Sequence, residues 1–283
     1  MRALFLILFL NSALLKAQDL PLYYGSEFLQ SYQQKSLKDD DLKSALFQIL
    51  SGGHIKKANQ PDELVSSCQD QANCVQHHAL GYDGARKKLF GYLYLKTLTD
   101  GSFSVKDVYC EKVYTDADFS VTPSIGPDLI PTGGSILNTE HTWPQSKFSG
   151  RFLKEMQKSD LHHLFPTDSD MNNHRASLHF GYVVTKHDEQ KCPQSKLGEN
   201  EQGELVFEVP DAQKGNTARA IFYFATRYQM QMSPTEEAAL RRWDKQDPVD
   251  AEEYNQNNLI DQLQGNRNPY IDFADLLDRV NHF

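Results

Sequence analysis

The amino-acid sequence predicts an α+β fold, mainly helical and built as a single domain. Three observations lead to this prediction. Apolar residues recur at helical spacing in several long segments. One further segment alternates apolar and polar residues as strands do, and two polar segments in the middle of the chain have the order strand, loop, strand, helix. The chain of 283 residues is long enough to bury a sizeable core.

Residues 1–17 have the pattern of a secretory signal peptide. Arg2 is a short positive region, Leu4 to Leu10 is a continuous apolar run, and Ala17 is a small residue where a signal peptidase could cut. The run is shorter than the roughly 20 apolar residues that span a bilayer as a helix. We therefore expect an exported chain of residues 18–283, periplasmic or secreted, with no membrane attachment after cleavage.

The first half of the mature chain is expected to alternate helices and strands. Its expected elements are a helix over Glu27 to Leu50, a helix over Gly81 to Leu95 that becomes a strand near Gly91, a strand over Val105 to Tyr114, and a long loop over 115–134. Gly52-Gly53 ends the first helix. The second carries Arg86 and Lys87 on its polar side. A loop as long as the one expected here is more often functional or mobile than structural.

The second half is expected to begin with two short strands and to end in helices. Its expected elements are strands over Asn138 to Trp143 and Leu161 to Phe165, and helices over Asn172 to Ser177, Thr217 to Met232, Pro234 to Trp243 and Pro248 to Leu263. Pro144 and Pro166 would end the strands. Ser169 or Asp170 would cap the first of these helices, and Ser233 the third.

The charge of the chain limits how it can hold a polyanion. The formal net charge is −9, and loss of Arg2 and Lys16 with the leader gives −9 − 2 = −11. An acidic protein must bind nucleic acid through a local basic patch or through a metal ion. The densest basic cluster is Arg86, Lys87 and Lys88, for which a solvated helix face is an equally good explanation.

The four cysteines predict two disulfides, because their number is even and the chain is expected to be exported. Four cysteines allow three pairings. Cys68 and Cys74 are close in sequence and could close a small loop, which would leave Cys110 with Cys192. A zinc site is disfavoured because the sequence contains no C-x-x-C spacing.

The candidate chemistry lies in segments 138–148 and 160–175. Hydrolysis of a phosphodiester needs a base to activate water, a divalent metal and a positive charge near the phosphate. His141 can be the base, and Glu140 and Asn172 can give a hard cation two oxygen ligands. Neighbours on a regular strand point to opposite faces, so Glu140 and His141 need a bend or bulge to share one cleft. A polar loop with satisfied histidines explains any single histidine, but not the whole set.

These motifs resemble the bacterial endonuclease I family. The resemblance rests on N-x-E-H-x-W-P-x-S from Asn138, on D-L-H-H-L-x-P from Asp160 and on N-x-x-R ending at Arg175. Weaker matches extend it from about Tyr82 to Asp272. It implies a ββα-metal (His-Me finger) core and a periplasmic or secreted nuclease of low sequence specificity. It further implies DNA as the substrate, with RNA as a second one, and Mg²⁺ as the cofactor, replaceable by Mn²⁺ or Ca²⁺. We expect a monomer.

The resemblance also implies roles for individual residues. His141 matches the general base, Glu140 and Asn172 match the metal ligands, and Arg175 matches an arginine near the scissile phosphate. Asn173 stands beside Asn172 and could be the asparagine ligand instead. The spacing from Asp160 favours Asn172.

Further residues are expected around this centre. Arg151 is a candidate for a second phosphate contact, and Arg86 and Lys87 are candidates for nucleic-acid binding. Asp160, His162 and His163 fit a supporting role, with packing between strand and helix as the alternative for the two histidines.

Two other functions remain open on the sequence alone. The first is an exported zinc hydrolase that uses His162, His163 and His174, although the H-E-x-x-H signature is missing. The second is a non-catalytic nucleic-acid-binding module. Restoration of activity by zinc or by Mg²⁺ after chelation would separate the first from a nuclease, and absence of turnover would identify the second.

Overall fold

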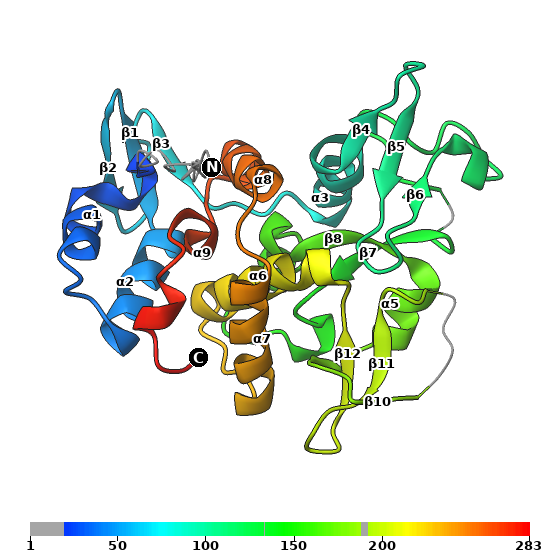
Figure 1. The fold of residues 1–283 in the computed structure, drawn as a ribbon. Helices are drawn as coiled ribbons and strands as arrows, with labels where there is room; N and C mark the ends of the chain where they lie inside the picture. The colour runs from blue at the N-terminus through cyan, green and yellow to red at the C-terminus, as the bar shows by residue number, and fades with distance from the viewer. Residues whose placement is uncertain (1–19, 133, 188–191) are drawn as a thin grey trace, which may run out of the picture.

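The computed structural model describes residues 20–132, 134–187 and 192–283. The predicted signal peptide, residues 1–17, lies outside the described residues. Within the described residues the strands form four small sheets between helices, so the α+β prediction is confirmed and "mainly helical" is too broad a description (Figure 1). None of the described helices is long and apolar enough to cross a membrane.

The N-terminal region combines two helices with a three-stranded sheet. Its elements are α1 (Gly25–Gln33), α2 (Asp39–Ser51), β1 (Gly53–Lys57), β2 (Gln60–Val65) and β3 (Cys74–Gln76), with strand order β2-β1-β3. The single helix expected over 27–50 is therefore two helices. Lys35 lies in the left-handed region, with φ of 53°, and residues 33–36 include no apolar side chain that could pack a continuous helix.

The next region is a short helix followed by an antiparallel sheet. Its elements are α3 (Tyr82–Lys88), a π-type turn (Leu89–Leu93), β4 (Leu95–Thr97), β5 (Phe103–Lys106) and β6 (Val113–Tyr114), in the order β4-β5-β6. The expected strand over 105–114 is wrong, because the chain turns back at Asp107. The Asp107 carboxylate accepts the backbone N–H groups of Tyr109, Cys110 and Lys112, which closes a turn.

The two motif segments form a strand pair followed directly by a helix. β7 (Leu137–His141) pairs antiparallel with β8 (Leu164–Asp168), and α5 (Ser169–Arg175) follows. Pro166 lies inside β8 and does not end it. The expected caps Ser169 and Asp170 are also wrong, because the Asp168 side chain accepts the backbone N–H groups at the start of α5.

The C-terminal half begins with a sheet that the sequence analysis did not anticipate. Its strands are β9 (His179–Phe180), β10 (Thr185–Lys186), β11 (Lys196–Glu199) and β12 (Leu205–Glu208), in the order β10-β11-β12-β9 with β9 and β12 parallel. Helices α6 (Lys214–Arg227), α7 (Pro234–Gln246), α8 (Ala251–Gln264) and α9 (Pro269–Asp272) follow. The three long helices were predicted, and α8 ends as expected at Gly265, whose φ of 84° suits glycine.

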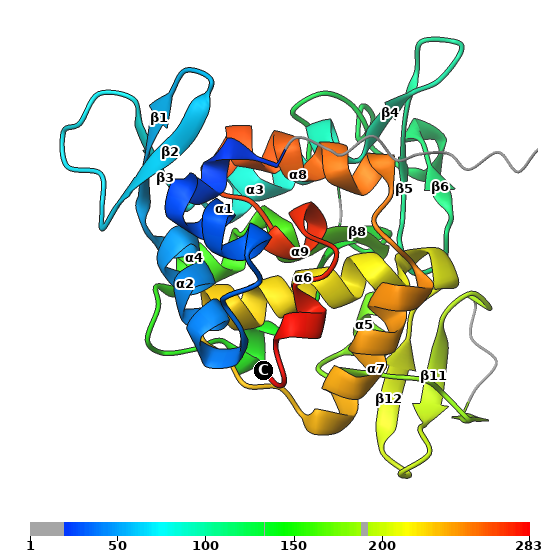
Figure 2. The ribbon, with the colours of Figure 1, turned by 60° about the vertical axis from the view of Figure 1, so that its left-hand side comes forward.

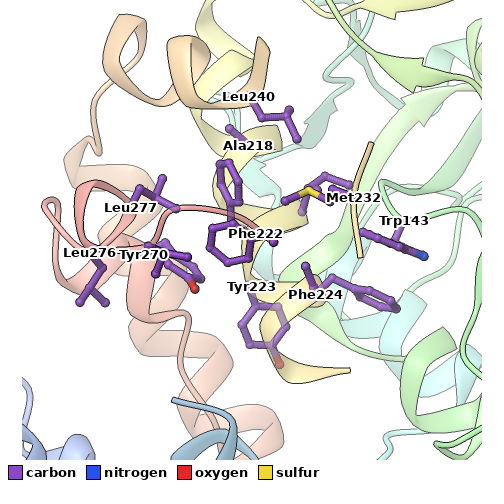
Figure 3. Close-up of a cluster of buried hydrophobic side chains, with 14 of the residues drawn as sticks. Trp143, Ala218, Phe222, Tyr223, Phe224, Met232, Leu240, Tyr270, Leu276 and Leu277 are labelled. Carbon is purple, nitrogen blue, oxygen red and sulfur yellow. The ribbon is translucent and has the colours of Figure 1, made fainter. Parts of the chain in front are cut away.

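Helix α6 is the centre of the main hydrophobic core. Almost every residue of α6 is buried, and the helix passes between α2 on one side and α5 and α7 on the other (Figure 2). Phe224 stacks on Trp143 at a centroid distance of 5.4 Å, and Phe222 packs with Tyr270 on the opposite side (Figure 3). A helix that is buried all round gives the motif segments a rigid support.

Both predicted disulfides are present in the structure. Cys68 pairs with Cys74, and Cys110 pairs with Cys192. The second bridge joins the turn that follows β5 to the segment before β11, and its sulfurs lie close to the Asp168 carboxylate. It therefore fixes the turn beside the start of α5.

Candidate active site

Strand β7 carries Glu140 and His141 on opposite faces. The β7–β8 ladder stays in register through His141, which lies opposite Leu164, so the expected bulge is not found in this pairing. Glu140 faces α5, whereas the His141 ring contacts the rings of Tyr82, Phe148 and His163. β7 ends at His141, so the histidine lies at the exit of the strand.

The contacts of His141 fix which ring nitrogen can accept a proton. Its Nε2 lies 3.1 Å from the carbonyl oxygen of Lys158. A carbonyl can only accept, so Nε2 carries the hydrogen and Nδ1 keeps its lone pair. Burial, together with the neighbouring His163, lowers the pKa of His141 to about 3, which keeps the ring neutral near pH 7. Nδ1 faces the amide nitrogen of Gln145 at 3.3 Å. The ring has the tautomer that a general base requires.

Glu140 is a buried carboxylate with an arginine partner. Its exposed fraction is 1%, and Arg175 Nη1 lies 2.8 Å from its Oε1. Burial raises the pKa of Glu140, while Arg175 and the Tyr109 hydroxyl act in the opposite direction. Oε1 has no hydrogen-bond partner among the described residues. The ion pair with Arg175 favours the charged form of this carboxylate, against the effect of burial.

Arg175 is held below the surface of the site. Its exposed fraction is 2%, and its guanidinium donates to the carbonyl oxygens of His141 and Thr142. It also lies 4.4 Å from the centroid of the Phe180 ring. Arg175 therefore clamps the end of β7 and the Glu140 carboxylate together. The predicted contact with a scissile phosphate stays a prediction.

Helix α5 directs Asn172 toward β7. The Asn172 amide donates to the Thr139 carbonyl oxygen at 3.3 Å, which leaves the amide oxygen free of that bond. Asn173 is exposed. Glu140 and Asn172 thus offer a carboxylate and an amide oxygen from adjoining elements, which are the donor types that Mg²⁺ and Ca²⁺ take. The donor set fits a hard divalent cation.

The histidines of the zinc alternative have other partners. His162 Nε2 bonds to the Asn266 carbonyl oxygen at 3.2 Å, and His163 Nε2 to the Gln157 carbonyl oxygen at 2.8 Å. His174 is exposed on α5. The closely spaced group of candidate metal ligands among the described residues is Cys110, Asp168 and Cys192, whose sulfurs form a disulfide. The described structure therefore does not bring the three histidines together.

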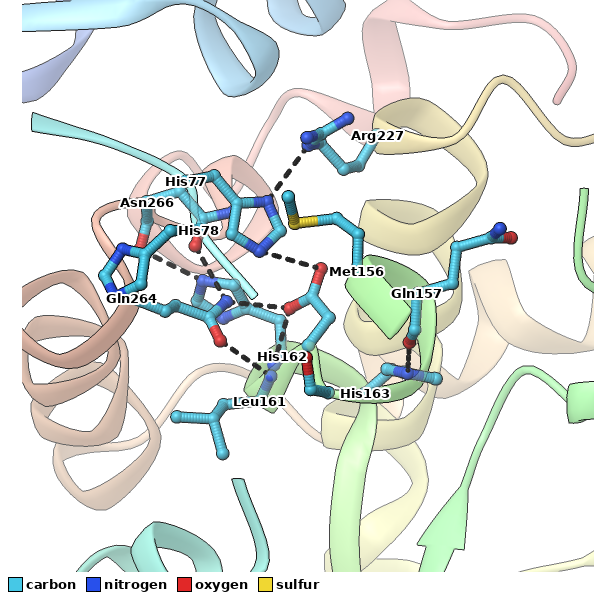
Figure 4. A network of polar contacts seen from close by, with 12 residues as sticks. His77, His78, Met156, Gln157, Leu161, His162, His163, Arg227, Gln264 and Asn266 are labelled. Carbon is cyan, nitrogen blue, oxygen red and sulfur yellow. Dashed lines mark hydrogen bonds and ion pairs between the residues drawn. The ribbon is translucent and has the colours of Figure 1, made fainter. Parts of the chain in front are cut away.

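A buried polar network that includes His77, His162 and Gln264 lies behind the site (Figure 4). Asp160 is a main acceptor in this network. Its carboxylate accepts hydrogen bonds from the Tyr223 and Tyr228 hydroxyls and from the Gln264 amide. Burial raises the pKa of Asp160, but the facing His77 and the Gln264 hydrogen bond hold it well below its usual range. The network holds the segment that directly follows α4 (Lys154–Lys158), whose last residue supplies the carbonyl that orients His141.

The basic residues nominated from the sequence lie in different places. The Arg86 guanidinium lies 5.6 Å from the centroid of the Tyr82 ring, which itself neighbours His141. Lys87 is exposed on the same helix. Arg151 donates to the Gln229 carbonyl oxygen beyond the end of α6, where it shares a pocket with α2. The structure therefore brings Arg86, but not Arg151, next to the partners of His141.

Four residues that contact His141 or Glu140 were given no role from the sequence. Lys158 acts through a backbone carbonyl, which no residue type reveals. Tyr109 reaches Glu140 only because the turn at Asp107 and the Cys110 disulfide place it there. Tyr82 and Gln145 approach His141 through ring packing and an amide contact. Tyr82 and Gln145 stand inside motifs of the resemblance, which is the one signal that could have identified them.

Comparison with known proteins places the chain in a family. Residues 68–275 match the model of the endonuclease I family, so the chain belongs to that family. It is 31% identical over 169 residues to an "Extracellular ribonuclease" of Bacillus subtilis (strain 168), covering 52% of this chain and 56% of the relative. It is 30% identical over 115 residues to a "Periplasmic deoxyribonuclease" of Aeromonas hydrophila, covering 41% and 48%.

A third relative is an "Endonuclease-1" of Buchnera aphidicola subsp. Baizongia pistaciae (strain Bp). It is 29% identical over 114 residues, covering 40% of this chain and 46% of the relative. The chain therefore spans about half the length of the curated relatives that it matches.

Proposed function

We propose that this chain is a metal-dependent endonuclease that hydrolyses phosphodiester bonds of nucleic acid with little sequence preference. The observation that carries the proposal is the pair at the end of β7. A neutral His141 presents an unprotonated Nδ1 where β7 ends, and the preceding residue, the buried Glu140, faces α5, whose Asn172 bonds to the Thr139 carbonyl oxygen of the same strand. We infer that β7, β8 and α5 form a ββα-metal core. The nuclease names of the relatives support the same reaction class.

In the proposed reaction His141 Nδ1 takes a proton from the water that attacks phosphorus. The hydrogen bond from Nε2 to the Lys158 carbonyl orients the ring and stabilises the imidazolium that forms. A divalent cation held by Glu140 and Asn172 would supply positive charge to the phosphate oxygens and to the leaving oxygen. Arg175 acts as a positioning residue, because its contacts are with Glu140 and with the carbonyl oxygen of His141.

The finer assignments are part of the same proposal. Mg²⁺ is the expected ion, with Mn²⁺ or Ca²⁺ as replacements. DNA is the first expected substrate and RNA the second, since the relatives include proteins named for each. The extracellular and periplasmic relatives support export of the chain, and a monomer is sufficient for the site because its residues come from one chain.

A plasmid-degradation assay on oxidised, metal-stripped protein tests the proposal. Mg²⁺ or Mn²⁺ should restore cleavage and zinc should not. His141→Ala should lower the rate by about 10²–10⁴-fold, the usual effect of removing a general base. His187→Ala is the matched control, because His187 is an exposed histidine paired with Glu199. Near-normal turnover of His141→Ala would remove His141 from its role, and binding without any cleavage by the wild-type protein would identify a binding module.

A further inference from the structure

Two cations and an aromatic ring border His141 on the side away from Glu140. The Tyr82 ring lies 5.6 Å from the His141 ring, centroid to centroid. The Lys158 ammonium lies 4.1 Å from the centroid of the Tyr82 ring, and the Arg86 guanidinium 5.6 Å from it. Tyr82 and Arg86 come from α3, whereas Lys158 ends α4. We call these three residues the Tyr82 cluster.

The positive charges of this cluster have few negatively charged partners within the protein. Among the described residues no carboxylate pairs with the Lys158 ammonium. Arg86 has only a distant partner, because its Nη1 lies 3.8 Å from a carboxylate oxygen of Asp83, which is 82% exposed. The Nε of Arg86 is buried and has no hydrogen-bond partner in the described structure. The net charge of the chain is −9, yet these two positive side chains beside the candidate base have no close carboxylate partner. This arrangement indicates an anionic ligand.

We propose that the Tyr82 cluster binds the phosphate that neighbours the scissile phosphate on the attacked strand. This inference rests on the proposed nuclease function and names the part of the substrate that this face recognises. Successive phosphates of one strand follow each other along the duplex with a rise of about 3.4 Å, so a strand whose scissile phosphate faces His141 carries its next phosphate past an adjoining side chain. Lys158 and Arg86 are the cations at that position.

The chemistry of the cluster also explains why recognition would be independent of sequence. Lysine and arginine donate charged hydrogen bonds to phosphate oxygens, which are the same at every nucleotide. The Tyr82 ring holds both cations by cation–π contact. None of these groups reads a base edge.

The side chain and the backbone of Lys158 can be tested separately. Every substitution at this position keeps the carbonyl oxygen that accepts from His141 Nε2, so Lys158→Gln removes the charge without removing that hydrogen bond. Lys154 begins the same short helix, is exposed and provides the matched control, Lys154→Gln. Arg86→Gln tests the second cation.

The experiment compares two substrates at several salt concentrations. One is a duplex oligonucleotide, and the other is thymidine 5′-p-nitrophenyl phosphate, which has a single phosphodiester and no neighbouring phosphate. Lys158→Gln and Arg86→Gln should each raise KM on the duplex by about tenfold, as expected for a charged hydrogen bond. Each should lower the salt slope of binding by about 0.9, the value for one lost phosphate contact. Each should lower kcat/KM on the small substrate by much less than on the duplex, and Lys154→Gln should match the wild type on both.

Binding of a labelled duplex in the His141→Ala background gives a second readout that does not depend on turnover. Variants that equal Lys154→Gln on the duplex would overturn the proposed subsite while leaving the nuclease intact. Equal losses on both substrates would also overturn it, because they would show that the cluster only supports His141. A wild-type protein that cleaves neither substrate would refute the proposed function itself.

Discussion

Asp160→Asn is expected to lower the stability of the protein by breaking a buried polar network. Asp160 is fully buried, and its Oδ2 accepts from the Tyr223 hydroxyl at 2.8 Å and the Tyr228 hydroxyl at 2.9 Å. Its Oδ1 accepts from the Gln264 amide at 2.8 Å and from the His162 backbone N–H at 3.1 Å. Asparagine replaces one of these oxygens by an amide nitrogen. With that nitrogen on the Oδ1 side the Gln264 and His162 N–H groups lose their acceptor, and on the Oδ2 side the two tyrosine hydroxyls lose theirs, so in either orientation two buried donors lose a carboxylate oxygen.

The expected size follows from those two donors. A buried polar group without its partner costs about 1–3 kcal/mol, so the change should lower the free energy of unfolding by about 2–6 kcal/mol. For a domain of this size about 4 kcal/mol corresponds to a decrease in Tm of roughly 10 °C. Asp128→Asn is the control, because Asp128 is an exposed carboxylate paired with Lys88 and should contribute less than about 1 kcal/mol.

Urea unfolding followed by circular dichroism measures the difference, and its pH dependence provides a second check. The pKa of Asp160 is held below its unfolded value of about 3.9. A carboxyl group with a depressed folded pKa stabilises the fold above the unfolded pKa, and this contribution is lost as the pH falls toward the folded pKa. The stability difference between wild type and Asp160→Asn should therefore shrink below about pH 4. A variant that unfolds within about 0.5 kcal/mol of Asp128→Asn at pH 7 would refute this account of the network.

Three other predictions concern the site and its frame. Asn172→Ala should lower kcat/KM and raise the Mg²⁺ concentration needed for half-maximal rate, whereas Asn173→Ala should leave both unchanged; the reverse result in a metal titration would move the ligand by one position. Arg175→Met should destabilise the fold by about 3–5 kcal/mol in urea unfolding, because it leaves the Glu140 carboxylate buried without its partner, and a loss below about 1 kcal/mol would contradict the positioning role. Reductant should lower the free energy of unfolding by about 2–4 kcal/mol for each disulfide lost, and mass spectrometry that finds four free thiols in protein from its native compartment would contradict the pairing.

Local sequence patterns predicted the elements that depend on local physics. The long helices α6, α7 and α8 follow from apolar spacing, and β7 followed by a second strand and a helix follows from the motif segments. The turn at Asp107 was missed because a run that alternates apolar and polar residues does not reveal that one side chain will accept three backbone N–H groups. Strands β9 to β12 were missed because they have two to four residues each, and β9 in addition depends on a parallel pairing with the distant β12.

In the candidate site, too, some features could be predicted from the sequence and others could not. The motifs single out Glu140, His141 and Asn172 as candidates, because the signal there is side-chain chemistry. The burial of Arg175 could not be predicted, because it depends on how α5 packs beneath β7. The unprotonated state of His141 Nδ1 could not be predicted either, because it depends on a carbonyl oxygen 17 residues away in the chain.

The Lys158 carbonyl links the stability of the Asp160 network to catalysis. Asp160 lies two residues after Lys158, and Asp160 is anchored by Tyr223, Tyr228 and Gln264 from two different helices. If the network positions the Lys158 carbonyl, Asp160→Asn should release the constraint on the His141 ring and allow both tautomers. At a temperature where the variant is fully folded, kcat should then fall by at least about tenfold while KM stays near the wild-type value, because substrate contacts are unchanged. A variant that is less stable but retains the wild-type kcat would show that the network supports the fold and has no part in orienting the base.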